Sequence, residues 1–249
     1  MRKTALLAIT VLLLCSVSAC SEDTKDNITI VTRAETTGAD ITLSFKKGGH
    51  YTQPTKVFGL IPMDLTPQIA VWIEDTDGNY IETLFVTEKA GTQGWMMSKK
   101  IRRPESLPCW SHRRGVVYPD GLFMPTRDNP LTDAVTAASP AGNFRLMTRV
   151  PKEISRFVIM TEVNNPGDYN DAYPKTPDEG SPNYSRGGVS GQPPIVFAAT
   201  VDLSSGPATV ELVPVGHGSP DGTDGTVNPD LSGLTTAKDI IRRITVSIP

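Results

Sequence analysis

The density of glycine and proline limits the fold of this chain more than any other feature of its sequence. There are 21 glycines and 21 prolines among 249 residues. Both residue types weaken the interior of a helix, and proline also removes a backbone donor. Between them lie many short runs of apolar and β-branched residues, a pattern typical of strands joined by turns. We therefore predict a mainly β chain with little helix and several long loops.

The order of the strand-like runs predicts antiparallel pairing. The run 68–74 is separated from the run 80–87 by Asp75-Thr76-Asp77-Gly78-Asn79. Asp-Gly between two alternating runs is a strong hairpin signal. Two further pairs are expected from short connections: 143–149 with 156–163, and 195–203 with 208–214. Many short strands of this kind predict an antiparallel β-sandwich.

The N-terminus has the layout of an export signal. Arg2 and Lys3 precede an apolar run over 5–14, and small residues follow up to Cys20. The apolar run is about half of the roughly 20 residues that a spanning helix needs. The order Val17-Ser18-Ala19-Cys20 resembles the lipobox of bacterial lipoproteins. There the cysteine thiol receives a diacylglycerol and cleavage makes the cysteine the new N-terminus. Ordinary signal cleavage near Ala19 is the alternative.

This interpretation divides the chain into three parts. Residues 1–19 are a lipoprotein signal peptide, 20–27 a polar, flexible tether, and 28–249 a single β-sandwich domain with long loop insertions. Position 21 is Ser rather than Asp, so the familiar signal for retention at the inner membrane is missing. We expect a protein anchored by lipid on Cys20 to the cell envelope, at the periplasmic or surface face of the outer membrane rather than at the inner membrane.

Charge and cysteine content exclude some functions. Removing residues 1–19 takes away Arg2 and Lys3, so the formal charge changes from −3 to −5. A mildly acidic chain argues against nucleic acid as a partner, because that role requires a concentrated basic patch. Cys15 leaves with the signal and Cys20 carries lipid, so Cys109 has no partner for a disulfide. We expect Cys109 to be a buried, inert thiol.

Three long irregular stretches, 89–131, 164–194 and 215–234, interrupt the strands. Loops of this length in a compact domain are usually functional or disordered. The stretch 164–194 combines Tyr169, Tyr173 and Tyr184 with several asparagines, a composition typical of recognition loops.

The stretch 215–234 also suggests a metal. It places Asp221, Asp224 and Asp230 among glycines. Carboxylates on a flexible glycine-rich loop are what calcium prefers, although the spacing is not that of an EF-hand. Ordinary turns use the same residue types, so a structural role is the alternative.

Several short motifs resemble a known family. The segment 71–84 (VWIEDTDGNYIETL), the Leu107-Pro108-x-Trp110 motif, and the segment 133–136 (DAVT) are similar to predicted periplasmic proteins known as domain of unknown function 2271. The resemblance covers about residues 68–163. It implies an immunoglobulin-like β-sandwich with long loops. It also implies proteins that accompany flavin-linked electron transfer outside the cytoplasm.

In that setting a transferase attaches flavin mononucleotide (FMN) to the last residue of the motif Asp-x-x-(Ser/Thr)-Gly-Ala-(Ser/Thr). The corresponding residues here are Asp133-Ala134-Val135-Thr136-Ala137-Ala138-Ser139, so Ser139 is the implied acceptor and Thr136 and Asp133 belong to its site. The motif departs from the pattern at Ala137, and loss of a glycine weakens a site that needs positive φ or close backbone approach. A polar strand edge with small residues is the alternative.

No complete catalytic constellation is present. The sequence lacks a G-x-S-x-G elbow, an H-E-x-x-H helix and a phosphate loop. We therefore predict a non-catalytic accessory or binding protein of the envelope, with the membrane and an envelope protein as partners and a role in flavin-dependent electron transfer. The alternative is a surface module that binds calcium or another ligand. A hydrolase would require a carboxylate or histidine of shifted pKa in a cleft.

Overall fold

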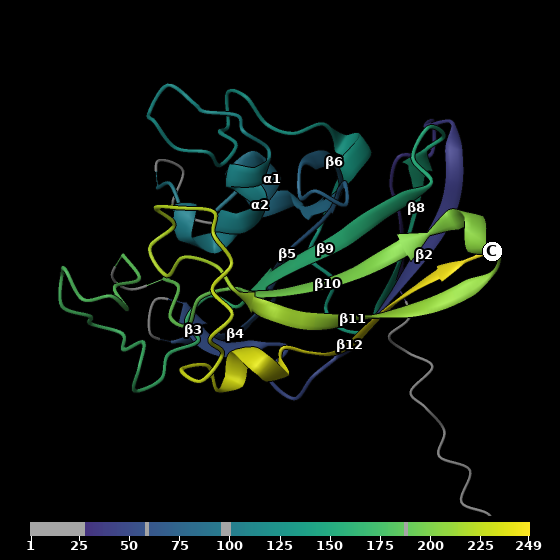
Figure 1. Ribbon diagram of the computed structural model, residues 1–249. Coiled ribbons are helices and arrows are strands. Elements are labelled where there is room, and N and C mark those ends of the chain that lie inside the picture. Colours follow the sequence, from purple (N-terminus) through teal and green to yellow (C-terminus); the bar gives the residue numbers. More distant parts are fainter. Residues whose placement is uncertain (1–27, 58–59, 96–100, 187–188) are drawn as a thin grey trace, which may run out of the picture.

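The computed structural model describes residues 28–57, 60–95, 101–186 and 189–249 (Figure 1). The signal peptide 1–19, Cys20 and the tether 20–27 lie outside the described residues. Within the described ranges, no helix is both long and apolar enough to cross a bilayer.

The chain is mainly β, as the sequence predicts. The strands are β1 Ile28–Val31, β2 Gly38–Lys47, β3 Gln53–Val57, β4 Ile61–Leu65, β5 Gln68–Glu74, β6 Tyr80–Thr87, β7 Thr136–Ala137, β8 Phe144–Pro151, β9 Arg156–Asn164, β10 Ile195–Asp202, β11 Ala208–His217 and β12 Ile241–Ile248. The α-helices are α1 Glu88–Thr92 and α2 Pro108–Arg113, and short 3-10 turns cover Pro104–Ser106, Asp133–Val135, Leu203–Ser205 and Thr236–Asp239.

Ten strands form one sheet in the order β1-β8-β2-β12-β11-β10-β9-β5-β6-β7, and β3 and β4 form a separate hairpin. The sheet is mixed, because β1 lies parallel to β8 and β7 parallel to β6, while its other neighbours are antiparallel. It curls until it nearly closes into a barrel (Figure 1). The predicted immunoglobulin-like sandwich is not confirmed, since a sandwich requires two packed sheets and this core lies inside a single curled one.

Side chains and backbone join the two edges of the curled sheet. The hydroxyl of Thr32, directly after β1, donates to the carbonyl of Leu84 in β6 at 2.8 Å. The next residue, Arg33, forms an ion pair with Glu82, and its backbone N–H donates to the carbonyl of Ala134 at 2.9 Å. We call the line where the two edges of the sheet meet the seam. Among the described residues these contacts join the edges there without strand pairing.

Strand β5 is buried on both faces along its whole length, and its residues 69–73 are all apolar. Ile69, Val71 and Ile73 point into the interior core of the curled sheet. Ala70 and Trp72 point outward into a second apolar cluster. The segment that contains α1 and α2 covers this outer face (Figure 1). The continuous apolar run of β5 therefore reflects a second layer outside the sheet.

Two of the three predicted hairpins are confirmed. β5 pairs with β6, and the Asp75 carboxylate accepts the backbone N–H groups of Asp77 and Asn79, each at 2.9 Å. β10 pairs with β11.

The predicted pairing of 143–149 with 156–163 is wrong. β8 pairs with β1 and β2, whereas β9 pairs with β5 and β10. Both strands contribute to the interior core, so they face each other across it instead of lying edge to edge. The burial of the two strands agrees with their separate places in the sheet. β8 has an exposed face, while the second half of β9 is buried on both faces.

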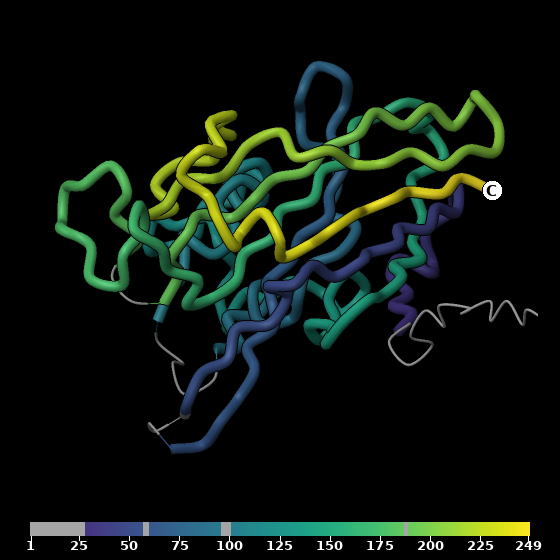
Figure 2. The backbone as a smooth tube through the Cα atoms, turned by 90° about the horizontal axis from the view of Figure 1, so that it is seen from below, coloured from purple at the N-terminus to yellow at the C-terminus, as the bar shows by residue number. Residues whose placement is uncertain are grey.

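The loops are unevenly placed along the barrel-like sheet. The β3–β4 hairpin, the stretch 164–194 and the stretch 217–240 gather at one end (Figures 1 and 2). β1 and the C-terminus lie at the opposite end (Figure 2). A site built from the long loops is therefore remote from the point where the chain enters the domain.

Candidate functional site: a basic cavity among the loops

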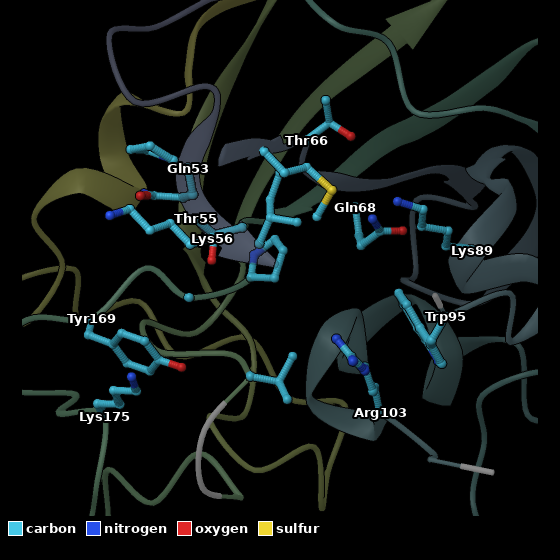
Figure 3. Close-up of a pocket in the computed structure, with 16 residues that line it drawn as sticks. Gln53, Thr55, Lys56, Thr66, Gln68, Lys89, Trp95, Arg103, Tyr169 and Lys175 are labelled. Atoms are coloured by element: carbon cyan, nitrogen blue, oxygen red, sulfur yellow. The ribbon is translucent and has the colours of Figure 1, made fainter. Parts of the chain in front are cut away.

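A cavity of about 500 Å³ lies at the loop end (Figure 3). Its walls come from the β3–β4 hairpin, the start of β5, Lys89, Trp95 and Arg103, and parts of the stretch 164–194. These elements are far apart in the sequence and meet only because the sheet curls. The volume lies within the range of roughly 300–1,000 Å³ that is typical of sites for small organic ligands.

Four cationic side chains line this cavity, which we call the basic cavity: Lys56 of β3, Lys89 of α1, Arg103 and Lys175. Of the residues that the structure describes, no Asp or Glu belongs to its lining. Among the described residues, none of the four forms an ion pair with a carboxylate. In a chain whose formal charge is −3, this is a local excess of positive charge. Concave surfaces lined by one sign of charge concentrate counter-ions of the opposite sign.

Arg103 is held by stacking. Its guanidinium carbon lies 4.7 Å from the ring centroid of Trp95, which is 6% exposed. Within the part of the chain that the structure describes, its buried Nε has no hydrogen-bond partner. Burial lowers the pKa of Arg103, with a smaller opposing effect of Glu105. This cation–π contact orients the guanidinium of Arg103 and does not neutralise its positive charge.

Uncharged polar groups accompany the cations. The side chains concerned are Gln53, Thr55, Thr66 and Gln68. Gln68 is fixed, because its carbonyl accepts a hydrogen bond from the hydroxyl of Thr87 at 2.8 Å. The apolar lining residues are Pro54, Met63, Leu65, Pro166 and Val189. The cavity therefore offers donors, acceptors and apolar surface beside its positive charge.

Tyr169 lies across the cavity from Arg103 (Figure 3). Burial raises the pKa of its phenol, and Arg103 opposes this with a smaller lowering effect. The phenol is thus a neutral hydrogen-bond donor around neutral pH.

Glu105 is the acidic group associated with the cavity wall. It is 5% exposed, and burial raises its pKa to about 7. Arg103 and Arg186 lower that pKa and Asp221 raises it, all by smaller amounts. Ionisation of Glu105 near neutrality therefore partly offsets the charge of Arg103.

A second buried carboxylate has a structural role. Glu162 of β9 is fully buried and accepts the backbone N–H groups of Cys109 at 3.1 Å and Trp110 at 2.8 Å. Burial raises its pKa to about 8, against the lowering effect of these bonds. Gly218 packs closely against it, since a Cβ at that position would lie 2.9 Å from Oε1 of Glu162. Glu162 fixes the start of α2, and its position gives the hydrolase alternative no support.

The residues of the implied flavin site lie on the edge strand β7 and beside it. Asp133 is exposed and Thr136 is half-buried. The Oγ of Ser139 is buried and has no hydrogen-bond partner among the described residues. Because the acceptor hydroxyl must reach the transferase, modification of the folded domain would require this segment to open. Attachment of FMN to Ser139 stays a prediction.

The carboxylates of the suggested calcium loop are engaged in separate turns. Asp221, Asp224 and Asp230 each accept the backbone N–H of the residue two positions later, at 3.1, 2.8 and 2.9 Å. Such bonds stabilise turns without a metal. In the described ranges no three or more His, Cys, Asp or Glu side chains are grouped to hold a metal ion. The calcium prediction gains no support from this arrangement.

Other sequence predictions have mixed outcomes. Cys109 is free and buried, as expected. Of the predicted recognition tyrosines, Tyr169 lines the basic cavity, whereas Tyr173 is 5% exposed and packs into the interior core. Tyr184 lies at a separate hollow beside 217–228. The four cations were missed: Lys56, Lys89 and Lys175 are isolated in the sequence, and Arg103 belongs to the basic run 99–103, which by itself does not indicate a cavity shared with the other three.

No protein-family model matches this chain, and neither a curated protein nor a solved structure matches it. The similarity to domain of unknown function 2271 therefore stays a prediction.

Proposed function

We propose that this chain is a non-catalytic binding protein of the bacterial cell envelope that holds an anionic ligand in the basic cavity. The observation that carries the proposal is the lining of four cationic side chains without a carboxylate. Attraction between charges is stronger beside a poorly solvated wall than in water. The well-placed charge of Arg103 and the neighbouring polar groups supply orientation as well as affinity.

The position of the cavity supports a tethered receptor. We propose that lipid on Cys20 anchors the protein to the outer membrane, on its periplasmic or surface face. The chain enters the domain at β1, and the cavity lies at the opposite end (Figure 2). A protein held at that end presents its cavity away from the lipid. The ligand is then accessible to an envelope partner that the protein serves as an accessory.

A binding measurement tests the proposal. Residues 20–249 with Cys20→Ser are titrated with citrate, phosphate or sulfate while sodium chloride keeps the ionic strength constant. We expect the melting temperature to rise with at least one anion. The rise should be lost when Lys56, Lys89, Arg103 and Lys175 are all replaced by Gln.

A matched variant controls for net charge. Replacement of Arg145, Lys152, Arg156 and Arg243 by Gln removes the same number of cations from exposed positions outside the cavity lining. This variant should respond as the unmodified protein does. Equal responses of the two variants, or no response of the unmodified protein to any anion, including the acidic saccharides tested below, would refute the proposal.

A further inference from the structure

The cations of the basic cavity are divided between two sides. In the view of Figure 3, Lys89 and Arg103 lie on the side of Trp95, and Lys56 and Lys175 lie on the side of Tyr169. Each side thus combines two positive charges with one aromatic ring. A ligand that uses both sides must carry anionic groups at two separated places.

The hydroxyl and amide side chains that accompany the cations are uncharged. In the same view Gln53 and Thr55 lie beside Lys56, Thr66 lies near the middle and Gln68 lies toward Lys89 (Figure 3). Amides and hydroxyls offer both donors and acceptors. A ligand that satisfies them carries hydroxyl groups as well as its charges.

Other anions fit this lining less well. A single phosphate or sulfate favours cations that converge on one point, and here they are divided. A nucleotide base could not stack on Trp95, which is nearly buried and whose ring Arg103 covers at 4.7 Å, so only the half-buried ring of Tyr169 would be left for it. An aliphatic dianion would leave the hydroxyl and amide side chains of the lining without hydrogen-bond partners.

We infer that the ligand is an acidic oligosaccharide with a carboxylate or sulfate on at least two of its sugar units. This inference rests on the proposed function. The cavity of about 500 Å³ has the size of a site for a small organic molecule, so it takes a short segment of such a chain. One anionic group binds Lys89 and Arg103, the other binds Lys56 and Lys175, and the sugar hydroxyls bind the uncharged polar side chains of the lining.

The test compares saccharides that differ in the number and kind of their charged groups. Galacturonate, trigalacturonate, a disulfated disaccharide and neutral maltotriose are titrated by calorimetry into residues 20–249 with Cys20→Ser. All titrations are made at one ionic strength. We expect trigalacturonate or the disulfated disaccharide to bind at least about tenfold more tightly than galacturonate, because a second charge-assisted contact is made. Whichever binds more tightly identifies carboxylate or sulfate as the natural group.

Two pair variants test the division of the cavity. Lys56→Gln with Lys175→Gln, and Lys89→Gln with Arg103→Gln, should each weaken binding of the oligomer about tenfold or more and leave galacturonate much less affected. Arg145→Gln with Lys152→Gln, on exposed positions elsewhere, is the control and should leave binding unchanged. Circular dichroism and the melting temperature establish that each variant is folded.

The outcomes separate the two proposals. If galacturonate or maltotriose binds as tightly as the charged oligomers, the inference about the ligand is overturned. It is also overturned if citrate or sulfate binds through the four cations and no saccharide does, and the proposed anion-binding function then survives. If neither the inorganic anions nor the acidic saccharides bind, both proposals fail.

Discussion

Replacing Glu162 by Gln should change how the stability of this protein depends on pH. The Glu162 carboxylate is fully buried and accepts the backbone N–H groups of Cys109 and Trp110 at the start of α2. Gln is almost isosteric with Glu, so the variant alters charge and hydrogen bonding without opening a cavity. The Gln side chain keeps one oxygen as an acceptor, and its NH₂ group stands in place of the second carboxylate oxygen.

The magnitude follows from the pKa of Glu162, which burial raises from 4.5 to about 8. Between these values the folded protein binds the proton more tightly than the unfolded chain, so stability falls as pH rises. At about 1.4 kcal/mol per pH unit, the loss has an upper bound of about 5 kcal/mol between the two pKa values. The stability of Glu162→Gln does not fall with pH in this way, because Gln does not ionise. However, the variant leaves one buried backbone N–H without an acceptor, which costs about 1–3 kcal/mol of stability at every pH.

The free energy of unfolding of both proteins is measured in urea between pH 5 and pH 9, followed by circular dichroism. Glu162→Gln should be less stable than the unmodified protein at pH 5 and more stable at pH 9. Glu211→Gln, at an exposed position of β11, is the control and should follow the unmodified protein. A difference between the unmodified protein and Glu162→Gln that stays constant over this range would refute the argument, since the carboxyl would then have an ordinary pKa.

Three further predictions concern other parts of the molecule. Glu105, whose pKa is about 7, ionises beside Arg103, so calorimetry should find that anion affinity falls several-fold between pH 6 and pH 8; Glu105→Gln should remove that change, and a change retained in the variant would contradict this role. Arg33→Met removes the ion pair with Glu82 at the seam and should lower the free energy of unfolding by about 2 kcal/mol in urea; an unchanged midpoint would mean that the seam contributes no stability. If Ser139 accepts FMN, co-expression with an active flavin transferase should raise the intact mass by one FMN and Ser139→Ala should abolish the increase; because the Ser139 hydroxyl is buried, this requires the segment to open, and an unchanged mass would remove the flavin hypothesis.

The mainly β character and two of the three predicted hairpins were accessible from the sequence because they depend on local signals. Asp75 and Gly78 determine the turn between β5 and β6 within a few residues, and the structure has that hairpin. The connection between β8 and β9 is also short, yet it joins strands that face each other across the core. A short connection permits either a hairpin or two strands that face each other across the core. Which of the two forms depends on which outer faces of the sheet are covered by other segments. That information lies in the segment with α1 and α2, far from either strand.

The candidate site was accessible only in part. The composition of the stretch 164–194 indicated a recognition loop, and Tyr169 and Lys175 of that stretch line the basic cavity. Lys56, Lys89 and Arg103 gave no such signal. Lys56 and Lys89 are single cations beside neutral or acidic residues, whereas Arg103 ends the basic run 99–103, and only the curled sheet brings the three to one cavity. Sequence motifs detect groups that are close in the chain, whereas this site consists of groups that are close only in space.

The layer outside the sheet connects the stability of the fold to the site. One wall of the basic cavity, with Lys89, Trp95 and Arg103, belongs to the same segment that covers the outer faces of β5 and β9. Glu162 fixes this segment to β9 through the start of α2. A change that loosens the layer should therefore weaken ligand binding before the curled sheet unfolds, because the interior core packs largely independently of the outer cluster. The role of the buried Glu162 carboxylate is then to attach the cavity wall to the sheet. Its pKa is high because this attachment lies inside an apolar layer.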